Sequence, residues 1–480
     1  MSIETYQQAL DFWHKRVNYE QRGMPSDLRE LKLDRMRSLL RRLGNPERGL
    51  PIVHIAGSKG KGSVAAMLSA VLQAAGMRTG LFTSPHLIRV EERVQIDGQP
   101  IDPDDLTRLM RIIADVVPDI EDEQGSQPTF FEIVTALGFL YFAQKKADLA
   151  VIEVGLGGRF DSTNVCDPLV SVITSISFDH TQQLGNTLVA IAGEKAGIIK
   201  PGRPVVSGET KPEPAEVIAT HAAMQGSPLR VLKRDFDVEY RPGSVSGSDP
   251  QLPGMRFQSA HRHWPWMELG LLGRHQAANA AVVVAVVEEL VRHGYAISDD
   301  AVAHGLRNVR WPARVEVVSQ RPWVIVDCAH NVASCEALVS TLAESLPPLP
   351  WTLLFAASRD KDLPGMMRVL APHFQTAIFT RYRSSQRGAD PELLLSLWRD
   401  AGGRNGQIVE SPTEAYHRIR GDLRNDELLC VTGSVFLAGE ILAEIRAEPG
   451  GGDTVPENPR GPAAPPTPEP GVGASDEVRQ

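Results

Sequence analysis

Seven consecutive residues combine three glycines, two lysines and two hydroxyl side chains: Gly57-Ser58-Lys59-Gly60-Lys61-Gly62-Ser63. A short apolar run, residues 52–56, precedes them, and an Ala/Leu-rich run, residues 64–75, follows. The flanks indicate a buried strand and a helix. A glycine turn between the two aims unpaired backbone N–H groups and a helix dipole at one point, which suits a phosphate. Lys61 would add positive charge, and the Ser63 hydroxyl could ligate a magnesium ion.

The spacing of this glycine loop is G-x-x-G-K-G-S, which is more compact than the common G-x-x-x-x-G-K-[ST] phosphate loop. A flexible turn with solvated lysines is the alternative interpretation. The strand before the loop and the helix after it favour phosphate binding, because they supply the geometry that this chemistry needs. The sequence therefore predicts a nucleotide site.

Composition narrows the classes of protein and partner. The chain has 480 residues, 42% hydrophobic and 23% charged, as expected for a globular protein of two or three domains. A net charge of −9 argues against nucleic acid as a partner. No run reaches the ~18 apolar residues of a membrane span, and the first residues lack a secretion signal. With four cysteines and no C-x-x-C pair, we expect a reducing, cytoplasmic location.

The glycine loop belongs to a series in which apolar strands alternate with helices. Strands are predicted at residues 52–56, 78–83, 149–154, 169–176 and 204–207. Helices are predicted at residues 33–43, 64–75, 106–117, 130–144, 187–199 and 276–292. This alternation is typical of an α/β protein with a doubly wound, mainly parallel sheet.

A second α/β unit, smaller and Rossmann-like, is predicted from Trp311 onward. Its strands fall at residues 323–326, 352–356, 376–380 and 428–431. Its helices fall at residues 333–346, 362–370, 391–401 and 435–446. Residues 234–272 alternate in short runs and predict a small antiparallel excursion that closes the first domain. We expect a nucleotide-binding domain at 1–310, a second domain at 311–447 and a disordered Pro/Gly-rich tail at 448–480.

Four polar residues that are far apart in sequence lie at or just beyond the ends of predicted strands: Ser63, Ser84, Glu153 and His180. Parallel strands end at a common rim, which is where ligands bind in a doubly wound sheet. Two hydroxyls, a carboxylate and an imidazole would make a reasonable magnesium site. Each has an alternative, because Ser84 and Glu153 could cap helices and His180 could serve a turn. Their shared rim favours the metal site.

Other residues carry two interpretations each. Lys195, on a small apolar helical segment, could extend to solvent or be neutralised or modified at the site. The run Asp327 to Asn331 follows a strand and could line the rim or form a turn. Arg314, at the predicted junction, could reach a phosphate or make a surface ion pair. His261 and His263 share one face of a strand, where a polar edge is the alternative to a metal pair.

Several long motifs, in the same order, resemble the folylpolyglutamate synthase/dihydrofolate synthase family of the Mur ligase superfamily. They are LDRMRSLLRRLGNP, HIAGSKGKGS, TSPHL, RVEERVQIDG, TFFE, IEVGLGGRFDSTN, SFDHTQQLGNTLVAIAGEKAGIIKPG, GRHQAANA, WPAR, DCAHN and TGSVFLAGE. The resemblance runs from about Leu33 to about Ile445. Two positions depart from the pattern: Ser58-Lys59 stands where most bacterial members have Thr-Asn, and Cys328 replaces a glycine. The second departure bears on local backbone geometry.

The resemblance implies specific roles for residues of this chain. It implies an ATP loop at Gly57 to Ser63 and a magnesium site at Ser63, Ser84, Glu153 and His180. It implies a carbamylated Lys195, and catalytic roles for Lys61, Lys195, His180 and Arg314. Further ATP contacts are implied at Asn279, Arg314, Asp327 and His330, and pterin or folate contacts at Thr129, Phe131 and Asp161.

The implied activity is an ATP-dependent ligase that uses ATP and Mg²⁺. The carboxylate of a folate, or of dihydropteroate, would attack the γ-phosphate of ATP, and the amine of L-glutamate would displace phosphate from the acyl phosphate. We expect small-molecule substrates, no nucleic acid or membrane partner, and a monomer. The alternatives are a Mur-type ligase acting on a cell-wall nucleotide precursor and a non-catalytic nucleotide-binding switch.

Overall fold

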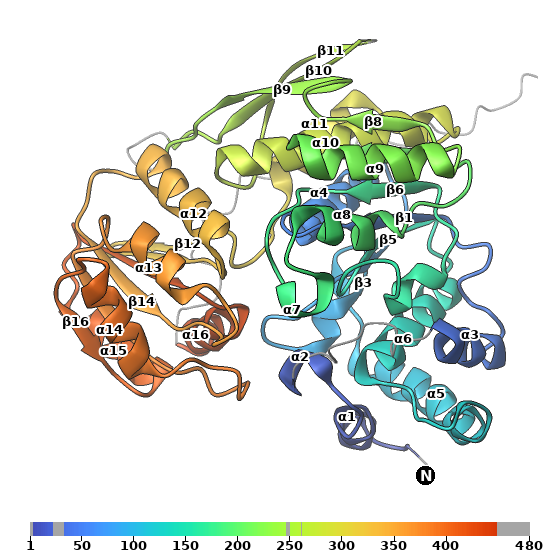
Figure 1. Cartoon of the computed structure of the whole chain (residues 1–480), viewed down its shortest axis with the longest axis horizontal. Coiled ribbons are helices and arrows are strands. Elements are labelled where there is room, and N and C mark those ends of the chain that lie inside the picture. Colours follow the sequence, from blue (N-terminus) through green and yellow to red (C-terminus); the bar gives the residue numbers. More distant parts are fainter. Residues whose placement is uncertain (1–2, 23–32, 246–249, 261, 449–480) are drawn as a thin grey trace, which may run out of the picture.

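The computed structural model describes residues 3–22, 33–245, 250–260 and 262–448. Two α/β lobes lie side by side, and the chain completes the first before it enters the second (Figure 1). Each lobe is built on a sheet of mainly parallel strands covered by helices. The predicted fold class, an α/β protein with a doubly wound first unit and a smaller second one, is confirmed.

The larger sheet belongs to the first lobe and has eight strands within the described ranges, in the order β4-β3-β2-β5-β1-β6-β7-β8. They are β1 (Ile52–Ala56), β2 (Thr79–Phe82), β3 (Val94–Ile96), β4 (Gln99–Pro100), β5 (Leu149–Glu153), β6 (Val170–Ile173), β7 (Val205–Ser207) and β8 (Leu229–Val231). Neighbours from β2 to β8 are parallel, whereas β3 pairs antiparallel with β2 and β4. Every residue of β1, β5 and β6 is buried, which explains why these strands are mainly apolar.

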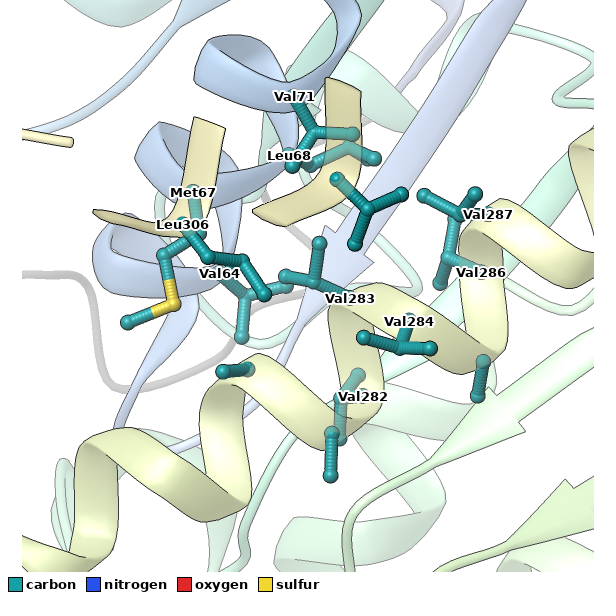
Figure 2. Close-up of a cluster of buried hydrophobic side chains, with 14 of the residues drawn as sticks. Val64, Met67, Leu68, Val71, Val282, Val283, Val284, Val286, Val287 and Leu306 are labelled. Carbon is teal, nitrogen blue, oxygen red and sulfur yellow. The ribbon is translucent and has the colours of Figure 1, made fainter. Parts of the chain in front are cut away.

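Helices cover both faces of this sheet. One face is packed by α4 (Lys61–Ala74), α10 (Arg274–Arg292) and α11 (Asp299–Asn308). Figure 2 shows Val64 and Leu68 of α4 close to Val283 of α10 and Leu306 of α11. The other face is packed by α1 (Tyr6–His14), α3 (Leu33–Arg42), α5 (Pro103–Gln124) and α6 (Phe130–Gln144). The remaining helices of this lobe are α2 (Tyr19–Arg22), α7 (Thr181–Leu184), α8 (Leu188–Ala196), α9 (Pro212–Met224) and the 3₁₀ turns η2 (Val90–Arg93) and η3 (Ser162–Val165).

The predicted antiparallel excursion is confirmed. Strands β9 (Phe236–Arg241), β10 (Gly254–Ser259) and β11 (His263–Glu268) form an antiparallel sheet above α10 in Figure 1. Phe236 and Phe257 stack with 5.6 Å between ring centroids and join the core that contains α10. His263 is exposed on β11, whereas His261, the other half of the suggested metal pair, lies outside the described residues.

The second lobe has a six-stranded sheet in the described part of the chain, in the order β12-β13-β17-β14-β15-β16. Its strands are β12 (Glu316–Gln320), β13 (Trp323–Val326), β14 (Trp351–Phe355), β15 (Thr376–Phe379), β16 (Gly406–Ile408) and β17 (Leu428–Thr432). Helices α12 (Val332–Ser345), α13 (Leu363–Leu370) and α14 (Pro391–Asp400) pack on one face. Helices α15 (Pro412–Asp422) and α16 (Val435–Ala447) pack on the other. All strands except β12 are parallel to their neighbours.

One predicted helix is longer in the structure, and two other expectations are not tested by it. Helix α5 is longer than the predicted 106–117, because Asp102 caps its start and Gly125, at φ +68°, ends it. The boundary placed at residue 310 remains a prediction, and the predicted tail lies almost wholly outside the described residues. None of the described helices is long and apolar enough to cross a membrane. The four cysteines, Cys166, Cys328, Cys335 and Cys430, are buried and free.

Helices α4 and α11 cross closely enough to require glycine. A Cβ at Gly305 of α11 would lie 2.5 Å from Val71 Cα and 2.6 Å from Val71 N of α4. We expect Gly305→Ala to lower the free energy of unfolding by about 1–3 kcal/mol, since backbone must move to relieve the overlap. Gly421→Ala in α15 is the matched control, because nothing lies within 4 Å of a Cβ there. The control should be neutral or stabilise by up to about 1 kcal/mol. Urea unfolding of both variants checks this, and equal stabilities would contradict it.

Candidate active site

The glycine loop and its predicted partners gather where parallel strands of the first lobe end. Ile55 of β1 is in register with Glu153, the last residue of β5, and Ala56 is in register with Ile173, the last residue of β6. The segments that follow these strands therefore leave the sheet at the same edge. This edge carries the four residues predicted to ligate magnesium: Ser63, Ser84, Glu153 and His180.

Two loop positions require glycine because neighbouring side chains come close to the backbone. A Cβ at Gly57 would lie 1.7 Å from Thr174 Oγ1. Gly60 is the N-cap of α4, with φ +84°, and a Cβ there would lie 2.4 Å from Asn279 Oδ1 of α10. The loop is thus shaped by close packing, and Asn279, for which an ATP contact was predicted, lies against it.

The rest of the loop is fixed by the segment after β6. Ser58 N donates to Ser175 O at 2.7 Å, and Ser58 Oγ donates to Ser177 O at 3.0 Å. Thr174 Oγ1 donates to Lys59 O at 2.6 Å. The side chains of Lys59 and Lys61 consequently leave a loop whose backbone is held on one side.

Glu153 is a buried carboxylate beside the first turn of α4. Its side chain accepts a hydrogen bond from Ser84 N at 3.2 Å and lies 3.8 Å from Lys61 Nζ. Burial raises the pKa of Glu153, and Lys61 opposes that shift. Glu153 therefore does not cap a helix. It connects the segment after β2 with the lysine of the glycine loop.

Lys195 is buried on α8, with 4% of its surface exposed, so the solvent-directed alternative is wrong. It makes no hydrogen bond or ion pair within the described ranges. Burial, together with the nearby charges of Lys61 and Lys59, lowers the pKa of Lys195 to about 7. A substantial fraction of its amine is therefore neutral near physiological pH, the state in which an amine can react with carbon dioxide.

His180 stands at the start of the short helix α7 with φ +51°. Burial lowers the pKa of its imidazole to about 3, so the ring is neutral at pH 7 and can offer a lone pair. Among the described residues, no three His, Cys, Asp or Glu side chains cluster to hold a metal. A magnesium ion at this edge would accordingly depend on Glu153, His180 and hydroxyl oxygens.

Four charged or polar side chains join the two lobes at the site. Asp179, next to His180, accepts hydrogen bonds from Lys59 Nζ at 2.7 Å and from Lys361 Nζ at 2.6 Å. Lys59 Nζ also donates to His330 Nε2 at 2.7 Å, and His330 Nδ1 donates to Cys328 O at 2.8 Å. The residues Lys59 and Asp179 belong to the first lobe, and His330 and Lys361 to the second.

The protonation states of this interlobe cluster follow from its burial and charges. Burial alone would raise the pKa of Asp179, but the nearby positive charge of Lys59 holds it well below its usual range. Burial lowers the pKa of His330 to about 4, which leaves the neutral ring that both of its hydrogen bonds require. Burial lowers the pKa of Lys59 to about 8, so it is still mainly charged at pH 7. The cluster is therefore an anion held between two cations.

The second lobe places its predicted site residues directly after β13. Asp327 is buried and accepts hydrogen bonds from Val315 N at 3.0 Å and Ala329 N at 2.7 Å. Arg314 donates to Ala313 O at 3.0 Å, contacts the Cys328 thiol, and forms no ion pair with a described carboxylate. Cys328 does not lie at positive φ, so a side chain fits where the family pattern has glycine.

Two of the three residues predicted to contact a pterin, Phe131 and Asp161, lie beside the segment after β5, and the third, Thr129, stands at the start of α6. The ring of Phe131 packs against Gly155, where a Cβ would lie 2.4 Å from Phe131 Cζ. Asp161 accepts from Leu156 N at 2.9 Å and from Thr163 N at 3.0 Å. Thr129 caps α6 through a reciprocal hydrogen-bond pair with Glu132. Part of the polar capacity of Thr129 and Asp161 is thus used to hold local backbone.

Two residues of the interlobe cluster were not predicted from the sequence. Asp179 adjoins His180 and follows β6, so its position at the rim could have been deduced. Lys361 follows β14, and its rim position was equally readable. The pairing of Lys361 with Asp179 could not have been deduced, because only the packing of the two lobes brings these residues together.

Comparison with known proteins identifies the class of enzyme to which this chain belongs. Residues 55–287 match the Mur ligase middle domain, and residues 313–435 match the glutamate ligase domain of Mur ligases. The chain is 35% identical over 448 residues to the dihydrofolate synthase/folylpolyglutamate synthase of Bacillus subtilis, covering 92% of this chain and 99% of the relative. It is 37% identical over 446 residues to the enzyme of the same name from Mycobacterium tuberculosis, covering 87% and 90% of the two chains.

Solved structures agree with these matches. The Mycobacterium tuberculosis folylpolyglutamate synthase complexed with ADP superposes with a TM-score of 0.83 at 32% identity, covering 92% of this chain and 99% of that one. E. coli FolC in complex with DHPP and ADP superposes with a TM-score of 0.79 at 28% identity, covering 92% and 98%. The chain belongs to the dihydrofolate synthase/folylpolyglutamate synthase family.

The close approach at Gly60 yields a test of the nucleotide site. We expect Gly60→Ala to weaken ATP binding by at least about tenfold, because the new methyl meets Asn279 and disturbs the N-terminus of α4. Gly76→Ala is the control: Gly76 follows the same helix at φ +80°, but nothing lies within 4 Å of a Cβ there. Both variants should lose about 1–2 kcal/mol of stability from backbone strain. Calorimetric titration with ATP should separate them, and equal affinities would argue against a nucleotide at this loop.

Proposed function

We propose that this protein is an ATP-dependent ligase that joins L-glutamate to the carboxylate of a reduced folate, and also to dihydropteroate. The observation that carries the proposal is the buried Glu153 carboxylate beside Lys61 and the glycine loop, in a chain that aligns along nearly its whole length with this family. Relatives with both activities in their names support the two acceptors.

The nucleotide is assigned to the glycine loop. Backbone N–H groups at the start of α4 and the charge of Lys61 face the phosphates. Asn279 and His330, each in contact with the loop, bound the same space, and Arg314 approaches from the second lobe. Asp327 supports this set indirectly, because its carboxylate orders the backbone next to Arg314 and His330.

The donor set at the strand ends suits Mg²⁺, which prefers oxygen ligands. Ser63, Ser84 and Glu153 offer such oxygens, and His180 offers a neutral imidazole. The raised pKa of the buried Glu153 indicates that its charge is only partly balanced by Lys61. Bound here, Mg²⁺ would neutralise charge on the phosphates.

The reaction then needs two displacements. A carboxylate oxygen of the acceptor attacks the γ-phosphorus, the bond to the bridging oxygen breaks, and ADP leaves with that electron pair. The amine of glutamate next attacks the acyl carbon, loses a proton, and expels inorganic phosphate. Two anions, the acceptor carboxylate and the γ-phosphate, must approach each other in the first step. The positive charges of Lys61 and Arg314 would reduce their repulsion and hold the phosphate in place.

The acceptor ring is assigned to the surface around Phe131. The Phe131 ring would offer a flat apolar face, and Asp161 and Thr129 are the polar residues predicted near it. Since Asp161 is buried and already bonded to backbone, we infer that it mainly orders the 155–163 segment that borders the ring. Both lobes of the site come from one chain, in keeping with a monomer, and the free, buried cysteines suit a reducing cytoplasm.

Glu153→Gln tests the assignment of the buried carboxylate. The substitution keeps size but removes charge, so kcat should fall at least about 100-fold while the fold is retained. The measurement is ADP release with ATP, L-glutamate and either tetrahydrofolate or dihydropteroate. Glu213→Gln, at an exposed position of α9, is the control and should remain active. Wild-type protein that consumes ATP without forming glutamylated product from either acceptor would refute the ligase.

The same assay separates the rival functions. A Mur-type ligase for cell-wall precursors would use a UDP-linked acceptor and neither pteridine acceptor. A nucleotide-binding switch would keep its ATP affinity in Glu153→Gln and show no product in the wild type.

Lys195 yields an independent prediction. Its amine has a pKa of about 7, and the neutral fraction that reacts with carbon dioxide increases as the pH rises through that value. We expect a carbamate resonance in ¹³C NMR after incubation with labelled bicarbonate at pH 8, stronger than at pH 6. Lys195→Arg should abolish the signal and turnover, whereas Lys211→Arg should preserve both. Unchanged turnover in Lys195→Arg would remove this lysine from the mechanism.

A further inference from the structure

Two neighbouring loops of the second lobe gather arginines that the proposed reaction does not use. The loop after β14 carries Arg359, and the loop after β15 carries Arg381, Arg383 and Arg387. Arg359, Arg381 and Arg383 are exposed. Two of them, Arg359 and Arg383, have no carboxylate partner among the described residues, and the proposed reaction gives them no role.

The two loops form one rigid surface. Ser358 and Gly388 form an isolated antiparallel bridge, and Arg359 N donates to Arg387 O at 2.9 Å. Ser358 Oγ and the hydroxyl of the buried Tyr382 are 2.7 Å apart. The guanidinium groups therefore project from backbone that is already ordered, which lowers the entropy cost of binding a ligand there.

The arginines differ in whether a carboxylate lies close enough to form an ion pair with them. Arg387 pairs with Asp360 at 2.7 Å and donates to Glu20 O of the first lobe at 3.1 Å. Arg381 lies 3.5 Å from Asp390, and both of those side chains are largely exposed. Arg359 and Arg383 have no carboxylate partner in the described part of the chain. Their side chains donate to Gln386 O at 2.6 Å and to Ser411 Oγ at 3.2 Å.

The acidic groups around this surface are accounted for. Asp360 is engaged by Arg387, and Asp390 and Asp362 cap helices α14 and α13. Glu440 accepts from the backbone N of Arg383 and of Ser384, each at 2.7 Å. Three arginines on this surface are exposed and are not held by a buried carboxylate, and we call Arg359, Arg381 and Arg383 the arginine patch.

The arginine patch borders the candidate active site at both ends. Lys361, two residues after Arg359, reaches Asp179 beside the proposed phosphate and metal positions. At the other end, Glu20, which Arg387 contacts, forms a paired hydrogen bond with Arg93 at 2.9 and 2.5 Å. The Arg93 guanidinium lies 5.3 Å from the centre of the Phe130 ring, the neighbour of Phe131. A chain extending along the seam between the lobes would therefore pass these loops.

The chemistry of the product indicates what such a chain is. Every γ-linked glutamate added to a folate leaves one more free α-carboxylate, so the acceptor becomes a longer polyanion with each turnover. Guanidinium groups bind carboxylates through paired hydrogen bonds, and several exposed pairs acting on one chain add up where a single pair is weak.

We propose that Arg359, Arg381 and Arg383 bind the γ-linked glutamate chain of acceptors that already carry several residues. This inference rests on the proposed ligase activity and names the residues that would hold the glutamate chain of a longer acceptor. An acceptor with a single glutamate carries only the α- and γ-carboxylates of its reacting residue, whereas longer acceptors carry further α-carboxylates between that residue and the pteridine, so the arginine patch distinguishes acceptors by length.

The test is steady-state kinetics of the full-length protein with tetrahydrofolate carrying one or four glutamates. In the double variant Arg359→Gln/Arg383→Gln, KM for the tetraglutamate should rise about five- to tenfold, with kcat unchanged. KM for the monoglutamate should stay within about twofold, which also shows that the variant is folded. Raising the salt from 50 to 200 mM should raise the wild-type KM for the tetraglutamate more than that for the monoglutamate.

Arg399→Gln/Arg418→Gln is the matched control, because it removes two exposed arginines of the same lobe away from these loops. It should change neither KM. A tetra-γ-glutamate peptide without a pteridine should inhibit the wild type and the control competitively, and the Arg359/Arg383 variant at least about fivefold less well. Equal changes for both acceptors, or an unchanged tetraglutamate KM, would overturn the inference. Wild-type protein inactive on both acceptors would instead refute the ligase itself.

Discussion

The site depends on one constraint, the parallel register of β1, β5 and β6. Since neighbouring parallel strands end side by side, the residues that follow them must share one edge of the sheet. Glu153 is the last residue of β5 and lies in register with Ile55, so it lies next to the start of the glycine loop. Lys61 and the residues of the lobe junction in the first lobe also follow these strands, so their positions depend on the same edge of the sheet.

The second lobe is attached to this edge by charge at the site itself. Asp179 is shared between Lys59 of the glycine loop and Lys361 of the other lobe, and His330 completes the bridge. Such contacts are directional and depend on nearby charge, unlike the apolar packing that holds α4 against α10. A polyphosphate next to Lys59 would compete for the same cation. A nucleotide at the glycine loop would therefore weaken the ion pairs that join the lobes, while the apolar cores of the two lobes would stay unchanged.

Much of this could be predicted from the sequence, for reasons that differ by element. The strands at 52–56 and 149–153 are mainly apolar because every residue in them is buried, and the glycine loop has a spacing with few alternatives. The order of strands guaranteed a common rim for Ser63, Glu153 and His180. Lys195 was ambiguous, because an apolar helical segment does not reveal whether its lysine is covered. The structure shows that Lys195 of α8 is buried.

What the sequence could not provide is pairing between distant segments. Lys361 and Asp179 meet only because two separately folded lobes pack together, and no local pattern encodes that contact. The arginines after β14 and β15 were equally invisible as a group, since they become neighbours through the Ser358–Gly388 bridge. Helices α11 and α15 were also not anticipated. Their short amphipathic runs resemble the connecting segments around them.

The placement of the cysteines has a practical consequence. All four thiols are buried, and burial raises the pKa of Cys166 to about 12 and that of Cys328 to about 11. Because the thiolate is the reactive form, maleimide dyes should leave the wild-type protein unmodified. A fluorophore pair could then be attached through one introduced cysteine on each lobe, and energy transfer between the dyes would report the distance between the lobes with and without nucleotide.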